Sequence, residues 1–294
     1  MRRIPRKTLL VSVTAALALA TGGTAWATGA TDNLSSTVGA VNSNVLPSDE
    51  FANAQLFSEV TTLDQLVTVN TPGKAPERVY VDYDNSIKLT ANNSLAKCTQ
   101  TDGALSTLTT AQAVAACGPA TTEGSGAAKA SLGNNTLPPF TVTAFNGPTS
   151  TPGGACTAPA DGVGGPVGCE WVGGNPTIIL FARNDTLSQS VPVRGEIEPN
   201  GALAGPPQQG GDVGYRLAVT DAPDVGGDTG ALTLFNALVG KNYTNGKSGK
   251  KKKKYSYVQA KCDDLDLNLN YGATWVYDDA SVDTGTWVQD CAVK

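Results

Sequence analysis

The chain has 294 residues, of which 33 are glycine, 17 are proline, six are cysteine and none is histidine. The absence of histidine excludes a Ser-His-Asp triad, a Cys-His dyad, a His-ligated zinc and a histidine acid or base. The formal net charge of −5 argues against a nucleic acid as the partner of the whole molecule.

Residues 1–27 predict a secretory signal peptide. A basic start with Arg2 and Arg3 is followed by an apolar run over residues 9–20 and by Ala25-Trp26-Ala27 at the cleavage position. The run is too short to span a membrane, and no later stretch reaches the roughly 18 apolar residues that a span requires. Pro5 stands where a twin-arginine signal usually carries an apolar residue, which favours the general secretory route. We therefore expect a secreted, extracellular chain with no transmembrane segment.

The rest of the chain is expected to be a flexible N-terminal segment over residues 28–48 and a β-rich domain over residues 49–294. The first of these is small and polar with no core pattern. Residues 147–175 are rich in glycine and proline, and they are read either as a long loop of one domain or as a linker between two β domains.

Short apolar runs with a period of two, separated by glycine and proline, predict many β-strands. In chain order these runs are Arg78–Tyr83, Phe140–Phe145, Thr177–Phe181, Val191–Ile197, Tyr215–Val219, Leu232–Leu238, Tyr255–Cys262 and Leu265–Tyr271. Thr109–Ala116 is the main helix candidate. The pattern predicts an all-β fold: a disulfide-stapled, β-sandwich-like domain with long Gly/Pro-rich loops.

All six cysteines lie beyond the predicted signal peptide, and an even number in an exported chain indicates disulfides. Six cysteines allow about 15 pairings, and sequence alone does not choose among them. The expected pairs are sequence neighbours: Cys98–Cys117, Cys156–Cys169 and Cys262–Cys291. No metal site is expected, because the chain has no C-x-x-C pair and no histidine.

The strand that ends in Asp264-Leu265-Asp266-Leu267-Asn268-Leu269-Asn270-Tyr271 alternates apolar and polar residues. Its polar positions have the spacing that begins a calcium loop. Leu269 and Trp275 stand where that loop needs glycine and glutamate, so a half-buried strand with a solvated polar face is favoured.

Residues 246–258, GKSGKKKKKYSYV, predict the exposed turn of a β-hairpin that Leu232–Leu238 enters and Tyr255–Cys262 leaves. Seven of the 17 basic residues beyond residue 27 lie in the 14 residues from Lys241 to Lys254, on a chain that is otherwise acidic. The candidate binding residues are Lys247, Lys250, Lys251, Lys252, Lys253, Lys254, Tyr255 and Tyr257, with Tyr243 beside them. Two readings stay open. The lysines attach the protein to an anionic surface, or they keep an exposed hairpin soluble and unpaired.

Paired carboxylates are the remaining route to an enzyme. Glu196 and Glu198 share a strand face, and Trp171, Trp275 and Trp287 are candidate platforms for stacking on sugar. A glycosidase needs two carboxyl groups about 5–10 Å apart across a cleft. The favoured reading is that these tryptophans fill the core or sit beside disulfides.

Several phrases occur in an order that resembles a group of uncharacterised, secreted, β-rich actinobacterial proteins. They are Leu95-Ala96-Lys97-Cys98, Cys117-Gly118-Pro119, Gly124-Ser125-Gly126, Val142–Gly147 and Tyr255–Cys262. In that group a strand ending in Cys leads to a Cys-Pro segment with Gly-x-Gly, and a late Tyr-Val-x-Ala-x-Cys strand closes the domain. Here Gly118 separates the cysteine from the proline. The resemblance covers about residues 75–291 and implies a β-rich, secreted fold without implying an activity.

The sequence therefore predicts a secreted, non-enzymatic structural or interaction protein that needs no cofactor. The expected partner is an anionic cell-wall polymer or membrane surface, met through the basic hairpin, and nucleic acid is not expected. The alternative is a carbohydrate-binding module or a carboxylate-dependent glycosidase. A glycan-binding assay separates the two hypotheses.

Overall fold

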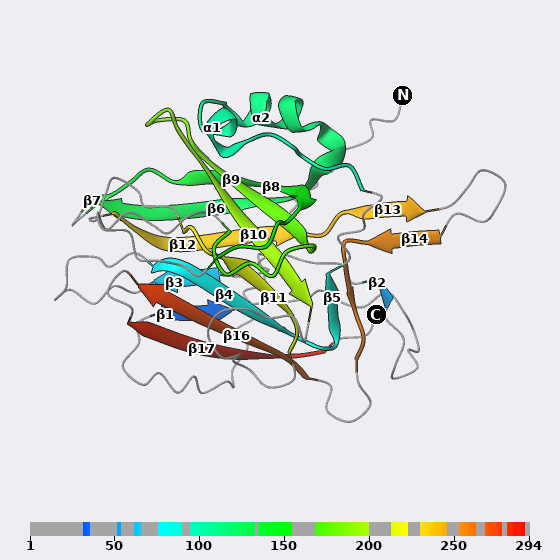
Figure 1. Cartoon of the computed structure of the whole chain (residues 1–294). Coiled ribbons are helices and arrows are strands. Elements are labelled where there is room, and N and C mark those ends of the chain that lie inside the picture. Colours follow the sequence, from blue (N-terminus) through cyan, green and yellow to red (C-terminus); the bar gives the residue numbers. More distant parts are fainter. Residues whose placement is uncertain are drawn as a thin grey trace, which may run out of the picture.

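Figure 1 shows the computed structural model of the chain. It describes residues 32–35, 52–53, 62–65, 76–89, 95–132, 135–154, 168–199, 213–222, 230–245, 253–262, 268–277 and 281–291. The predicted signal peptide lies outside these residues. The described part is mostly β-strand, so the all-β prediction is confirmed.

The elements in chain order are β1 (Asp32–Ser35), β2 (Ala52–Asn53), β3 (Thr62–Gln65), β4 (Pro76–Asp84), β5 (Ile87–Leu89), α1 (Asp102–Leu105), α2 (Thr110–Cys117), a 3-10 turn (Pro119–Thr121), β6 (Thr122–Leu132), β7 (Asn135–Thr136), β8 (Phe140–Thr149), β9 (Pro176–Asn184), β10 (Gln189–Pro199), β11 (Val213–Val219), β12 (Gly230–Val239), β13 (Asn242–Asn245), β14 (Lys253–Ser256), β15 (Val258–Ala260), β16 (Asn268–Tyr277) and β17 (Val282–Asp290). None of the helices in the described residues has the length and hydrophobicity needed to cross a membrane.

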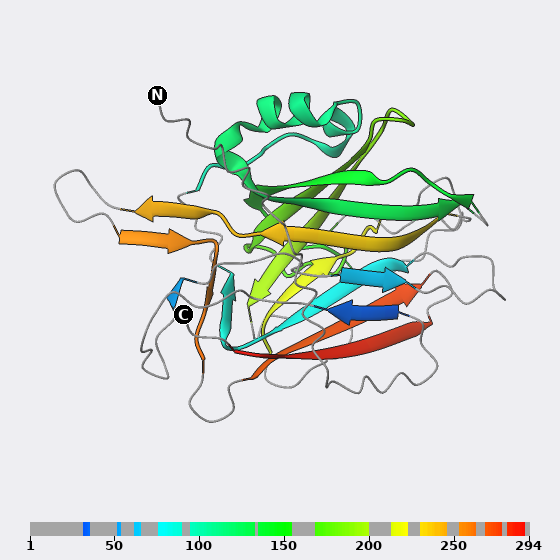
Figure 2. The same cartoon turned by 180° about the vertical axis from the view of Figure 1, so that it is seen from behind.

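Twelve strands form one antiparallel sheet in the order β1-β3-β12-β6-β8-β9-β10-β11-β4-β16-β17, with β7 paired to β6. The sheet curls on itself, so that β1 at one edge lies beside β17 at the other (Figures 1 and 2). Strands from both sides of residues 147–175 belong to this sheet, because β8 pairs with β9 and β4 pairs with β11 and β16. β1 falls within residues 28–48, so these four residues have regular structure that their composition did not predict.

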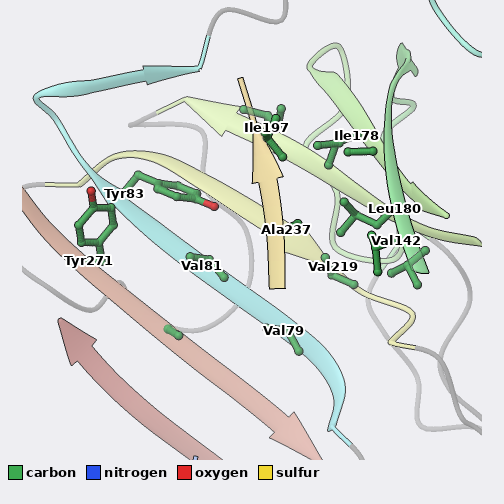
Figure 3. Close-up of a cluster of buried hydrophobic side chains, with 14 of the residues drawn as sticks. Val79, Val81, Tyr83, Val142, Ile178, Leu180, Ile197, Val219, Ala237 and Tyr271 are labelled. Atoms are coloured by element: carbon green, nitrogen blue, oxygen red, sulfur yellow. The ribbon is translucent and has the colours of Figure 1, made fainter. Parts of the chain in front are cut away.

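The inner face of the curled sheet encloses the main hydrophobic core. The alternation of β4 sends Val79, Val81 and Tyr83 into this core, as the period of two predicts. Tyr83 meets Tyr271 of β16 edge to face, with ring centroids 6.2 Å apart. Figure 3 shows this cluster, to which β8, β9, β10, β11 and β12 also contribute through Val142, Ile178, Leu180, Ile197, Val219 and Ala237.

The two helices pack on the outer face of β8 and β9 (Figure 1). α2 begins with a capping box, in which Thr109 accepts from the Gln112 N–H and the Gln112 side chain accepts from the Thr109 N–H. Leu105 and Ala113 pack with Phe145, Ile179 and Phe181 in a second, smaller core. The Cys98–Cys117 disulfide ties this layer together. Both the helix and this pairing were predicted.

Two small sheets complete the described part: β13-β14, and β2-β15-β5. The predicted strand Tyr255–Cys262 is therefore interrupted at Tyr257, where the chain leaves β14 and enters β15. Beyond β15, Cys262 is bonded to Cys291, which follows β17, so a second predicted disulfide is confirmed. Cys169 is also disulfide-bonded, but Cys156 lies outside the described residues, and that pairing stays a prediction.

Candidate functional site

The lysine-rich segment belongs to a β-hairpin made of β13 and β14. Asn242 pairs with Ser256, Tyr243 with Tyr255, Thr244 with Lys254 and Asn245 with Lys253. In both views the hairpin extends to one side, away from the large sheet (Figures 1 and 2). A β-hairpin is therefore present in this part of the chain, and its two strands form a sheet of their own.

The predicted binding residues lie in β14, in the main core, or outside the described residues. Lys253, Lys254 and Tyr255 lie in β14, with Tyr243 opposite Tyr255. Lys247 and Lys250 to Lys252 lie outside the described residues.

Tyr257 corrects the sequence-based prediction. Its side chain is 1 % exposed and packs in the main core. The physical reason is the break after β14, since Tyr257 sits in a bend where the Ser256 hydroxyl donates to the carbonyl of Val258. Tyr257 is therefore not available to a surface ligand.

The incoming side of the hairpin also differs from the prediction. β12, which contains Leu232–Leu238, belongs to the large sheet, and β13 follows it after Gly240 and Lys241. We call Ala120–Gly124 together with Gly240 and Lys241 the hairpin root. Because the chain changes sheets at this point, the root fixes how the hairpin leaves the body.

Three hydrogen bonds hold the hairpin root. The N–H of Gly240 donates to the carbonyl of Glu123 at 2.9 Å. The Lys241 Nζ donates to the carbonyl of Ala120 at 2.6 Å, and the N–H of Tyr257 donates to the carbonyl of Lys241 at 2.8 Å. The segment around the start of β6 is thus bonded to Gly240 and Lys241, which precede β13. Lys241 is in turn bonded to Tyr257, which follows β14.

β6 and β12 approach closely at the root. A Cβ added to Gly124 would lie 1.8 Å from the carbonyl oxygen of Leu238. Any side chain would clash there, so the position requires glycine. The pairing of β6 with β8 shifts register between Thr122 and Gly124, which makes Glu123 the extra residue of a β-bulge. Bulges redirect side chains, and this one accompanies the burial of Glu123.

Glu123 is a buried carboxylic acid without a hydrogen-bonding side-chain partner. The residue is 3 % exposed, and neither carboxyl oxygen has a hydrogen-bond partner. Burial raises the pKa of Glu123 from 4.5 to about 7, against the opposing effect of the Lys241 charge. Thr122 Oγ1 and Asn146 Oδ1, on the paired strands β6 and β8, are likewise buried without a partner. Within the root, the buried oxygens without a partner are thus those of Thr122 Oγ1 and of the Glu123 carboxyl group, whose pKa lies near neutral pH.

A second charged cluster lies on the face of β10, β11 and β4 that points away from the main core. Its side chains form a row across the three strands and are buried. Register places Arg216 between Glu198 and Asp82, and all three residues are at most 1 % exposed. The Arg216 guanidinium donates two hydrogen bonds to Asp82, from Nε to Oδ1 at 2.7 Å and from Nη2 to Oδ2 at 3.0 Å. It also lies 5.2 Å from the ring centroid of Tyr80. The Arg216–Asp82 ion pair therefore links β11 to β4.

Glu170 extends this row toward solvent. Its carboxylate accepts from the Tyr80 hydroxyl at 2.6 Å and from Arg78 Nη1 at 3.2 Å. Burial, followed by the hydrogen bond to Glu170, raises the pKa of Tyr80. The carboxylate is thus engaged by an ion pair and a phenol.

Glu196 anchors the segment that follows the predicted loop. It is fully buried and accepts from the Ser150 hydroxyl at 2.5 Å, the N–H groups of Val172 and Gly173 at 2.8 and 2.9 Å, and Asn175 Nδ2 at 3.0 Å. Glu196 and Glu198 do share a strand face, as predicted. With four donors, the Glu196 carboxylate has the surroundings of a structural group.

The tryptophans lie mainly in the interior. Trp275 is 0 % exposed in the main core. Trp171 is 8 % exposed, packs with Tyr80 and Ala218, and donates its Nε1–H to the carbonyl of Ala218 at 3.2 Å. Trp287 is half-buried against the main core. Trp171 and Trp275 therefore do not provide stacking faces for a sugar.

The polar alternation near the C-terminus gives a strand. Leu269 and Tyr271 are buried, whereas Asn268 is exposed and Asn270 half-buried. Asn270 donates its N–H and its Nδ2 to Asp84 Oδ2 at 3.0 and 3.1 Å. Asp264 and Asp266 lie outside the described residues, and within the described ones no group of three or more acidic or cysteine side chains is placed to hold a metal ion.

Comparison of the chain with protein-family models, with curated proteins and with solved structures finds no match. Its function has to be argued from the residues themselves.

Sequence reasoning missed Glu123 and Lys241 as a pair. They are 118 positions apart, and β6 has the glycine- and alanine-rich sequence TEGSGAAKASL, in which Thr122 is the one β-branched residue that signals a strand. The only available signal was the rarity of glutamate, with seven in the chain.

Proposed function

We propose that this chain is an exported, non-enzymatic binding protein that uses the β13–β14 hairpin to attach to a phosphate-rich anionic surface of the cell envelope. The observation that carries the proposal is the position of the lysines. Lys253 and Lys254 lie in β14, and Lys247 and Lys250 to Lys252 fall between β13 and β14 in the sequence.

The projection of the hairpin supports attachment. Its two strands form a sheet separate from the twelve-stranded one and extend away from it. A lysine near a charged surface contributes up to about 1 kcal/mol at low ionic strength, so a run of adjacent lysines adds up to useful affinity. Because the rest of the chain is acidic, the contact is confined to this element, and the body is repelled by the same surface.

The disulfides support export. Cys98–Cys117 and Cys262–Cys291 are bonded, as is typical of proteins that fold in an oxidising compartment. Residues 1–27 have the pattern of a secretory signal. The four hydrogen bonds that Glu196 accepts favour a structural role for this carboxylate over a role in glycoside hydrolysis.

The experiment measures sedimentation of the purified chain with two kinds of vesicle, phosphatidylcholine alone and phosphatidylcholine mixed with phosphatidylglycerol, and with purified wall teichoic acid. Binding should occur on the phosphate-rich surfaces and weaken as salt rises to about 0.15 M, where the Debye length falls to about 8 Å. The two arms distinguish a lipid headgroup from a wall polymer as the source of phosphate.

Replacing all five lysines from Lys250 to Lys254 with serine should remove the salt-sensitive binding. The matched control replaces the same five lysines with arginine, which keeps the charge and should keep the binding. Binding that survives the serine replacement, or that is lost in the arginine control as well, contradicts the proposal.

A further inference from the structure

The hairpin root combines features that the attachment role does not need. A carboxylic acid is buried at a β-bulge, its oxygens have no hydrogen-bond partner, and its own backbone carbonyl receives the N–H of Gly240. Removing an ionised carboxylate from water without hydrogen-bonding it is strongly unfavourable. In the closed root Glu123 is therefore favoured as the neutral acid.

We propose that the hairpin root is a pH-sensitive joint, in which neutral Glu123 keeps the root closed and ionised Glu123 opens it. Opening releases the bonds from Gly240 to Glu123 and from Lys241 to Ala120, so that water reaches the carboxylate. The joint stands on the structure of the root alone. Its consequence for attachment rests on the proposed function.

The charged groups around Glu123 are few. β8, β12 and the 3-10 turn, which adjoin the start of β6, contain no titratable side chain. On β6 itself Lys129 is six positions away and exposed. Lys241 is the charged group whose field acts on the carboxyl, and it favours the ionised form. Burial raises the pKa of Glu123, and the positive charge of Lys241 lowers it. The effect of burial is the larger, because the pKa is raised to about 7 with both effects acting.

The direction of the effect follows from linkage. A carboxyl group whose pKa is higher in the closed state than in the open state stabilises the closed state at low pH, and this stabilisation is lost as pH rises through the higher value. With 4.5 for the open root and about 7 for the closed root, the open fraction should rise about tenfold between about pH 6 and pH 8. Release of Lys241 would then free the chain just before β13 from Ala120.

Hydrogen exchange measured by NMR on the native chain tests the joint directly. The protection factor of the Gly240 amide, corrected for intrinsic exchange, should fall about tenfold between about pH 6 and pH 8. In Glu123→Gln, which keeps the shape and cannot ionise, it should stay constant over the same range. The Ala113 amide, which donates to Thr109 in α2, is the internal control and should not change in either protein.

The Gly240 amide chemical shift gives a second reading, with a midpoint near pH 7 in the native chain and none in Glu123→Gln. Constant protection in the native chain, or equal pH dependence in both proteins, overturns the joint. A midpoint that calcium chloride moves and a chelator restores also overturns it, because a cation and not a proton would then neutralise the root oxygens.

These outcomes separate the joint from the attachment role. If the serine variant of Lys250–Lys254 binds as well as the native chain while Gly240 still titrates, the proposed function fails and the joint stands. If the vesicle binding is lysine-dependent while Gly240 does not titrate, the joint fails and the proposed function stands.

Discussion

Replacing Arg216 with methionine should be among the most damaging changes to the stability of this fold. Arg216 and Asp82 are 1 % and 0 % exposed and share two charge-assisted hydrogen bonds. Glu198 lies opposite Arg216 on the neighbouring strand and is also fully buried. Arg216→Met therefore leaves two buried carboxylates on either side of an apolar side chain.

Removing one partner of a buried ion pair costs about 3–5 kcal/mol, and the second carboxylate places Arg216→Met at the upper end of that range. Asp82→Asn keeps the shape and leaves Arg216 opposite Glu198, so its cost should be smaller, about 2 kcal/mol. The double variant should cost less than the sum of the two single variants by at least about 1 kcal/mol, because they share one interaction.

Urea unfolding monitored by tryptophan fluorescence gives these free energies, since Trp171 and Trp275 are buried and report on the packed state. Arg216→Lys is the milder control, because it keeps the positive charge and loses the two parallel hydrogen bonds to Asp82. A cost below about 1 kcal/mol for Arg216→Met, or a cost smaller than that of Asp82→Asn, would refute the reasoning.

Three further changes test other contacts. The native chain should lose about 2.5 kcal/mol of unfolding free energy relative to Glu123→Gln as pH rises from about 5 to about 8.5. The reason is that folding raises the pKa of Glu123 from 4.5 to about 7, so its ionisation destabilises the fold. Parallel pH profiles of the two proteins in urea would contradict this. Glu196→Ala should cost about 3 kcal/mol or more and expose residues 168–175 to limited proteolysis, since four donors lose their acceptor; an unchanged cleavage pattern would count against it. Replacing Cys98 and Cys117 together with alanine should lower the thermal midpoint by the equivalent of about 2–4 kcal/mol, and calorimetry with no shift would show that the bond is dispensable.

The strands that the sequence predicts best are those with a strict period of two. Val79, Val81 and Tyr83 alternate with residues of the opposite face, and the same pattern holds at Leu269 and Tyr271. Each of these strands has one face on the core, so the alternation is a direct consequence of burial. The helix was predicted from the alanine-rich run Thr109–Ala116, and the structure adds the capping box at Thr109.

β6 could not be predicted from its own residues. Its glycines and alanines have low strand propensity, and the segment becomes a strand because β8 and β12 supply its hydrogen bonds on both sides. At Gly124 the approach of Leu238 requires the missing side chain. A residue that looks like a strand breaker in sequence is here a requirement of the tertiary contact.

The candidate site was predicted in part, for a similar reason. The lysine run and the hairpin are local features, and both follow from a contiguous stretch of sequence. The place of Glu123 depends on a partner more than a hundred residues away, Gly240, whose N–H donates to the Glu123 carbonyl, and Tyr257 is buried because it packs in the main core. No local pattern records such a contact.

The order of the strands has a consequence for when the protein can fold. β4 is bonded on one side to β11 and on the other to β16, where Tyr83 pairs with Tyr271 across 188 residues of chain. β4 therefore has no strand partner until β11 is available, and its second partner, β16, comes only near the end of the chain. Such distant pairing slows folding. For a polypeptide that is threaded unfolded through a narrow translocon, as the predicted signal peptide implies, slow folding is an advantage, because the sheet cannot close until its last strands have passed.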